Sequence, residues 1–127
     1  MQLKLEDLVS RSQQSDLDKY KIAKIIIDDE GNYIIAEKCN IKTISYILDN
    51  YDDGVDQTVM LIYEHCQILK NAELQRIYGC HEPFEVVEKV FLSNMELIEK
   101  AADSIMKMYG IGRKQGEINA VDMVKNS

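Results

Sequence analysis

The hydrophobic pattern of residues 20–40 is that of two strands joined by a turn. Two short runs rich in isoleucine and tyrosine stand on either side of the polar sequence DDEGN. Runs of β-branched and aromatic residues around such a cluster are typical of a β-hairpin. Gly31 and Asn32 tolerate the positive φ angles that tight turns require. We therefore predict a β-hairpin over residues 20–40.

From about residue 55 the apolar residues recur every three or four positions, which is the period of an amphipathic helix. The first such helix is predicted over residues 57–70, with Asp56 as its N-cap. Its predicted apolar face consists of Val55, Val59, Ile62, Cys66 and Leu69. Before it, KTISYILDN fits a strand or a helix, and YDDGVD is a predicted turn.

Glycine, proline and asparagine mark the ends of three further helices. The helix in NAELQRIYG is predicted to stop at Gly79, a C′ glycine. Pro83 is placed at the first position of a helix over PFEVVEKVFL. Asn94 is the predicted N-cap of a longer helix that Gly110 closes. The buried face of that longer helix is predicted to contain Met95, Ile98, Ala102, Ile105 and Tyr109.

The two ends of the chain carry shorter patterns. A short amphipathic helix is predicted from the spacing of Leu3, Leu5, Leu8 and Val9, and a polar linker is predicted at SRSQQSD. This helix and linker form the front of the chain (residues 1–15). After the loop GIGRKQGE, a last short helix is predicted to carry Ile118, Val121 and Val124. Together these patterns predict one α+β domain over residues 1–127. It is mainly α-helical, with an N-terminal β-hairpin followed by a compact bundle of four or five short helices over residues 55–127.

Charge narrows the choice of partners. The 127 residues include 22 acidic and 15 basic side chains, giving a net charge of −7 and a pI of about 4.8. Such a surface repels nucleic-acid phosphates and anionic membranes, so we expect protein partners instead. The alternative is that the charge only keeps a small protein soluble. The chain shows no signal-like apolar segment at its start and no apolar run of about 18 residues, which favours a cytoplasmic location.

The cysteines and histidines do not have the spacing of a metal site. Cys39, Cys66 and Cys80 are odd in number and far apart, which argues against a disulfide framework. The adjacent pairs His65-Cys66 and Cys80-His81 are poor chelators, because neighbouring helical residues point about 100° apart. We expect Cys66 in the core, His65 on the solvent face, and no bound metal or other cofactor.

Catalytic patterns are equally weak. Cys80 and His81 are sequence neighbours, which does not make them a catalytic dyad. Gly110 and Gly112 follow a helix, whereas a phosphate-binding loop precedes one. A calcium loop aligned on Gly54 has Met60 at the twelfth position, where a bidentate glutamate is needed. Many carboxylates are predicted on solvated helix faces, among them Glu85, Glu88, Glu96 and Glu99. The basic residues do not alternate with aromatic ones as in nucleic-acid-binding surfaces; they are Lys89, Lys100, Lys107, Arg113 and Lys114. We therefore expect a protein that is not an enzyme.

Residues 70–127 carry a set of matches to a known family. The segment from LKNAELQRIYG to the terminal VKNS resembles the XkdN-like tail assembly chaperones of PBSX-type phages and prophages. The first matching element consists of Glu73, Leu74, Gln75, Tyr78 and Gly79. Leu92 and Glu96 fit a leucine-to-glutamate junction, although Asn94-Met95 stands where the family usually has a glycine. Lys125 and Asn126 fit the end of the chain. The hairpin and the short segment after it agree with the family in outline.

The resemblance implies a chaperone that binds and solubilises the tape-measure protein while a phage tail is built, with the tail-tube protein as a second partner. It implies action in the bacterial cytoplasm and absence from the finished virion. An acidic domain with an apolar groove between helices suits such a client. Met95, Met106 and Met108 are either an adaptable binding surface or plain core, and the matched residues are either scaffold or partner contacts. The alternative function is a small acidic regulatory protein that sequesters a transcription or replication factor.

Overall fold

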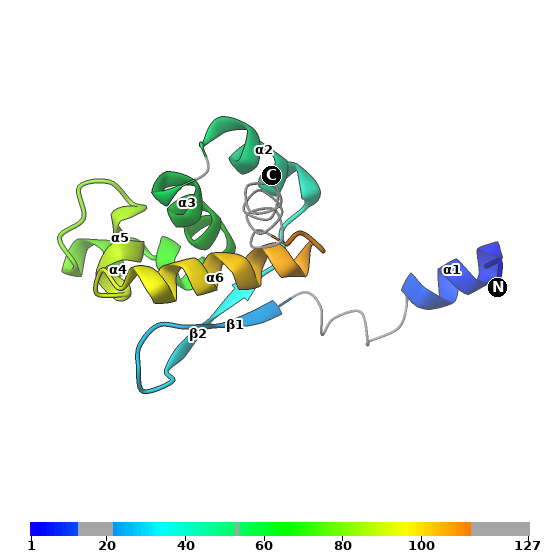
Figure 1. Cartoon of the computed structure of the whole chain (residues 1–127), viewed down its shortest axis with the longest axis horizontal. Coiled ribbons are helices and arrows are strands. Elements are labelled where there is room, and N and C mark those ends of the chain that lie inside the picture. The colour runs from blue at the N-terminus through cyan, green and yellow to red at the C-terminus, as the bar shows by residue number, and fades with distance from the viewer. Residues whose placement is uncertain (13–21, 53, 113–127) are drawn as a thin grey trace, which may run out of the picture.

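The structure, a computed structural model, describes residues 1–12, 22–52 and 54–112. A two-stranded hairpin is followed by a set of helices, which confirms the predicted α+β, mainly helical class (Figure 1). In chain order the elements are α1 (Leu5–Ser12), β1 (Ile22–Ile26), β2 (Tyr33–Glu37), α2 (Ile41–Asn50), α3 (Val55–His65), the 3₁₀ helix η2 (Gln67–Lys70), α4 (Ala72–Ile77), α5 (Glu85–Val90) and α6 (Met95–Met108). The predicted last helix with Ile118, Val121 and Val124 lies outside the described residues, as do residues 13–16 of the predicted linker.

The hairpin forms where the sequence predicts it. β1 and β2 pair antiparallel, with Ile25 opposite Ile34. Asp28 organises the turn: its carboxylate accepts hydrogen bonds from the backbone N–H groups of Glu30 and Asn32, both at 3.0 Å, and from the Asn32 side chain at 2.7 Å. These bonds, the side-chain bond first, hold the pKa of Asp28 below its usual value. Gly31 adopts the positive φ that the turn needs.

The core lies where α6 passes between the hairpin on one side and α2 and α3 on the other (Figure 1). Ile25 and Ala36 enter it from the sheet, and Ile98, Ala102 and Ile105 enter it from α6, all at most 2% exposed. The three α6 residues have the three-to-four spacing of the predicted buried face, so the pattern predicts these three correctly. α1 stands apart from the other elements in Figure 1, and none of its residues is buried.

The region around α2 and α3 partly departs from the prediction. The ambiguous KTISYILDN segment is helical, because Asn40 caps it by accepting the Thr43 N–H at 3.1 Å. α3 begins at Val55 with Gly54 as its N-cap, so Asp56 lies within the first turn and the predicted cap is wrong. The helix ends at His65 and the chain tightens into η2, instead of continuing to residue 70.

Five other predicted helix features can be compared with the structure. Asn94 caps α6 by accepting the Leu97 N–H at 3.2 Å, and Gly79 and Gly110 have positive φ after their helices, as predicted. Pro83 does not open α5; it lies in the preceding turn, two residues before the helix begins. Met95 is 43% exposed rather than buried, because as the first residue of α6 it lies at the helix end, beyond the packed layer.

Candidate functional site

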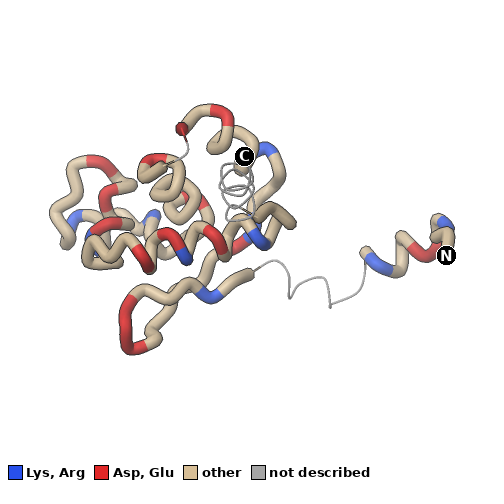
Figure 2. The backbone as a smooth tube through the Cα atoms, viewed as in Figure 1, with Lys and Arg blue, Asp and Glu red and all other residues tan. Residues whose placement is uncertain are grey.

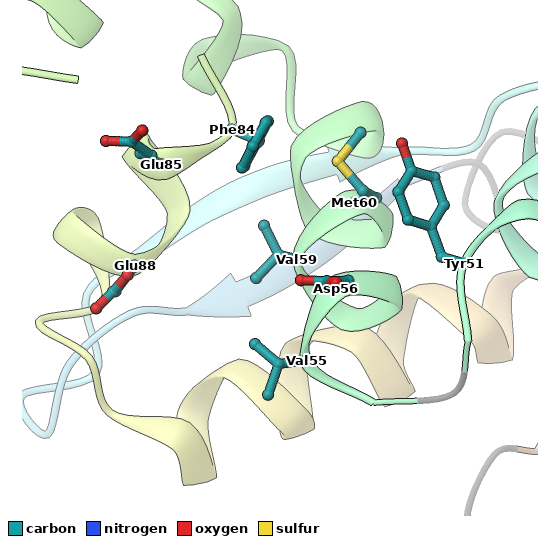
Figure 3. A pocket seen from close by; sticks show the side chains of 8 residues that line it. All are labelled: Tyr51, Val55, Asp56, Val59, Met60, Phe84, Glu85 and Glu88. Carbon is teal, nitrogen blue, oxygen red and sulfur yellow. The ribbon is translucent and has the colours of Figure 1, made fainter. Parts of the chain in front are cut away.

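One surface hollow among the described residues is a groove between α3 and α5. It has a volume of about 290 Å³. Val55 and Val59 point into it from α3, and the Phe84 ring forms the wall at the start of α5 (Figure 3). Its described lining residues are Tyr51, Val55, Asp56, Val59, Met60, Phe84, Glu85 and Glu88. The apolar members are more exposed than the helix pattern predicts, with Val55 at 55% and Phe84 at 40%.

This groove carries a one-sided charge. Three of its eight lining residues are carboxylates, namely Asp56, Glu85 and Glu88, and none of the described lining residues is basic. Glu85 accepts the backbone N–H groups of Glu82 at 2.9 Å and His81 at 3.3 Å. These bonds lower the pKa of Glu85, so it stays ionised at neutral pH. Acidic positions also occur on the hairpin turn and on α6 (Figure 2).

A second hollow continues the groove toward α2. It has a volume of about 390 Å³ and shares Tyr51 and Met60 with the first. Its other described lining residues are Asn40, Lys42, Thr43, Tyr46, Ile47 and Glu64. Glu64 forms an ion pair with Lys70 at 2.6 Å, and Lys42 is the basic residue among the described lining residues. The two hollows therefore adjoin at Tyr51 and Met60, with three carboxylates at the hollow beside α5 and Lys42 at the hollow beside α2.

The lining of the two hollows mixes apolar and charged side chains. The hollow beside α5 combines apolar side chains, Val55, Val59 and Phe84, with three carboxylates, a combination that suits an amphipathic helix. Each hollow is near the lower limit of about 300–1,000 Å³ that is typical of small-molecule pockets. Among the described residues, no group of three or more His, Cys, Asp and Glu side chains is placed to hold a metal ion. In the same part of the chain, no helix has the length and apolar character needed to cross a membrane.

The prediction for His65 is wrong, because this side chain is fully buried. Its Nδ1 lies 2.7 Å from the Leu61 carbonyl and its Nε2 lies 2.6 Å from the Tyr109 hydroxyl. The same hydroxyl accepts the Cys39 N–H at 2.9 Å. This network ties the end of β2, α3 and the end of α6 together. Burial also lowers the pKa of His65, so the ring is neutral at neutral pH.

The cysteines are not paired with one another. Cys66 is buried in the core as predicted, and burial raises its pKa to about 12. Burial is also the main cause of the raised pKa of Cys39. Thiols with raised pKa values are poor nucleophiles at neutral pH, because the thiolate is the reactive form. These two cysteines are therefore structural.

Three of the residues that match the chaperone family serve the scaffold. Leu74 packs partly buried against the core. Gln75 donates from Nε2 to the Leu69 carbonyl at 2.8 Å, which holds α4 against η2. Gly79 has φ +69°, which allows the chain to turn after α4. These roles explain the matched residue types without a partner.

Other matched residues face solvent. Glu73 pairs with Arg76 within α4, and Glu96 pairs with Lys100 in α6 at 3.0 Å. Tyr78 is 41% exposed and Leu92 is 81% exposed. Lys125 and Asn126 lie outside the described residues. Of the three methionines considered, Met106 is buried, Met108 packs at the core edge and Met95 is exposed.

Leu92 has an unusual backbone. Leu92 and Ser93 both have positive φ, at 52° and 57°, a conformation that costs a non-glycine residue about 1–2 kcal/mol. The Ser93 hydroxyl donates to a Glu88 carboxylate oxygen at 3.1 Å, so this turn adjoins the acidic end of the groove. The isolated fold gains no burial from Leu92. The backbone of this turn ends α5, because the Ser93 N–H donates to the Glu88 carbonyl at 2.8 Å and the Leu92 N–H donates to the Lys89 carbonyl at 3.2 Å.

Sequence reasoning did not identify the groove residues. The helix pattern places Val55 and Val59 on an apolar face and Phe84 directly after Pro83 in the predicted helix PFEVVEKVFL, and periodicity alone does not separate core from groove. One usable signal is that acidic residues lie within about one helical turn of these apolar residues in the sequence. Asp56 is close to Val55 and Val59, and Glu85 and Glu88 follow Phe84. No family model, curated protein or solved structure matches the chain.

Proposed function

We propose that this protein is a tail assembly chaperone that binds the tape-measure protein of a phage or prophage and keeps it soluble during tail building. The observation that carries the proposal is the apolar groove between α3 and α5 with its acidic rim. A tape measure is a long, helical chain rich in apolar residues, and the groove offers it a surface of complementary kind. The matches over residues 70–127 supply the choice of client.

The net charge of −7 supports the same function. An apolar client that is covered by an acidic protein gains both burial and electrostatic repulsion between complexes, which oppose aggregation. The second candidate is a small acidic protein that sequesters a transcription or replication factor, since it would share the charge and the groove. Gene order separates the two, because the chaperone predicts a tape-measure gene immediately downstream and a tail-tube gene upstream.

Co-expression tests the proposal. The tape-measure protein of the same phage or prophage is produced in bacteria with the full chain, without it, and with an unrelated acidic protein of similar charge. We expect a larger soluble fraction and a complex on affinity purification only with this chain. Equal insolubility in all three cultures, with no complex recovered, refutes the chaperone function and leaves the regulatory candidate in first place.

A further inference from the structure

We propose that the groove recognises one class of segment: an amphipathic helix with a narrow apolar face and basic residues at one end. This inference rests on the proposed chaperone function and names the part of the client that is bound. It commits the occupant to a helix of a partner protein. The described structure supplies three arguments, from shape, from charge and from the turn at Leu92.

The shape of the groove favours a row of side chains. The two hollows share the lining residues Tyr51 and Met60, so they lie next to each other along α5, α3 and α2. A helix laid along them presents residues at i, i+3 or i+4, and i+7 to successive hollows. Val55 and Val59 are themselves one turn apart on α3 and form a matching apolar ridge (Figure 3).

The charge of the groove gives the bound helix a direction. Asp56, Glu85 and Glu88 surround the hollow beside α5, whereas Lys42 lies at the hollow beside α2. A lysine or arginine at one end of the client helix meets carboxylates only when that end lies beside α5. Opposite charges at the two ends penalise the reversed orientation by placing like charges together. The groove therefore favours helices with lysine or arginine at one end over apolar helices that are acidic or uncharged.

The turn at Leu92 extends the same surface. Its link from Ser93 to Glu88 places the turn beside the acidic end of the groove. There a leucine that is 81% exposed is held in a strained backbone conformation. We assign Leu92 as an additional apolar contact for the basic end of the client helix, where it covers the aliphatic part of a lysine or arginine side chain.

Peptide binding tests the groove without the tape-measure protein. The probe is a fluorescent amphipathic helix of about sixteen residues, with leucines on one face and lysines at one end. Its control has glutamate in place of each lysine. By fluorescence anisotropy with the full-length chain, we expect the lysine peptide to bind at least about tenfold more tightly, with an advantage that shrinks as salt is added. Equal affinities for the two peptides overturn the proposal.

Matched variants place that binding in the groove. Asp56→Asn with Glu88→Gln removes two rim charges, and Asp29→Asn with Glu30→Gln removes the same charge at the hairpin turn. Glu85 is left intact because it caps backbone N–H groups. We expect the rim variant to weaken the lysine peptide about tenfold and the hairpin variant less than twofold. Equal weakening by both variants overturns the groove and indicates attraction by net charge alone.

Crosslinking separates this inference from the chaperone function. A photo-crosslinking amino acid replaces Val55, which is 55% exposed in the groove, or Ile68, which is 57% exposed outside both hollows. With co-expressed tape-measure protein, we expect a crosslink from position 55 only. A complex that crosslinks from position 68 alone overturns the groove and leaves the chaperone function in place. A crosslink from position 55 to a second copy of this chain, or to its own α1, also overturns the inference. If no complex forms, the chaperone function fails and the peptide assay decides about the groove.

Discussion

The Tyr109 hydroxyl joins three parts of the chain that are far apart in sequence. It accepts the Cys39 N–H at 2.9 Å and lies 2.6 Å from Nε2 of His65, while Nδ1 of His65 lies 2.7 Å from the Leu61 carbonyl. Because Nδ1 faces a carbonyl, it carries the proton in the neutral ring, and Nε2 accepts from the hydroxyl. The change Tyr109→Phe removes this hydroxyl and keeps the aromatic ring, which stands edge-on to His65 at 5.5 Å.

The size of the stability loss in Tyr109→Phe follows from the groups that lose their hydrogen-bond partner. The lost bonds contribute about 1 kcal/mol each, and an acceptor left buried without a partner costs about 1–3 kcal/mol. His65 is fully buried, so its Nε2 bears most of this cost, whereas Cys39 is only partly buried and its N–H can reach water. We therefore expect Tyr109→Phe to lower the free energy of unfolding by about 2 kcal/mol, which corresponds to a fall in Tm of roughly 6–10 °C for a domain of this size.

Urea unfolding followed by circular dichroism measures this effect, with the m-value as a check that unfolding remains two-state. A double-mutant cycle with His65→Leu isolates the pair. Because the apolar leucine needs no hydrogen bond, the second change should cost less in the presence of the first, with a coupling of about 1–2 kcal/mol. A loss below about 0.5 kcal/mol for Tyr109→Phe, or additive single changes, refutes this account of the network.

Further predictions concern pH, packing, capping and the Leu92 turn. Burial holds the pKa of His65 below 6.5 in the fold, so the unfolded chain binds more protons and stability should fall as the pH drops below about 6.5. Thermal melts from pH 8 to 5 should show this fall in Tm, and His65→Leu should make it smaller. Ile105→Ala should cost about 2–4 kcal/mol in urea unfolding, because the side chain is fully buried. Asn94→Ala should cost about 1 kcal/mol in the same assay, through loss of the α6 cap. Leu92→Gly should leave the free energy of unfolding unchanged or raise it by up to about 1 kcal/mol, because glycine adopts the positive φ without strain. The same change should weaken binding of the lysine peptide. A stability loss above about 1 kcal/mol would instead indicate a scaffold role for Leu92.

Local signals predicted the elements well where one short segment determines the structure. The hairpin follows from two β-branched runs and the turn around Asp28, and the ends of α4 and α6 follow from Gly79 and Gly110. The α6 cap follows from Asn94. In each case the decisive hydrogen bond or φ angle lies within about four residues of the predicted position, so it can be inferred without tertiary structure.

Features that depend on tertiary contacts were not predictable in the same way. His65 has the sequence context of a surface residue, but Tyr109 lies 44 residues away and supplies the partner that allows burial. Val55 has the phase of a core residue, but it faces the groove beside α5 and stays 55% exposed. α3 packs against α5 in a way that helix periodicity does not encode, and the groove lies between these two helices.

Hydrogen exchange on the purified complex with the tape-measure protein tests the central claim most directly, namely that the groove of this chain holds a segment of that client. Amide exchange is compared between the free chain and the complex, and protection is mapped onto peptides of this chain. The account predicts added protection in residues 54–60 and 84–93, which border the groove and the Leu92 turn, and unchanged exchange in the hairpin turn at residues 28–32. Protection confined to the hairpin, or a complex that leaves residues 54–60 and 84–93 unchanged, contradicts it.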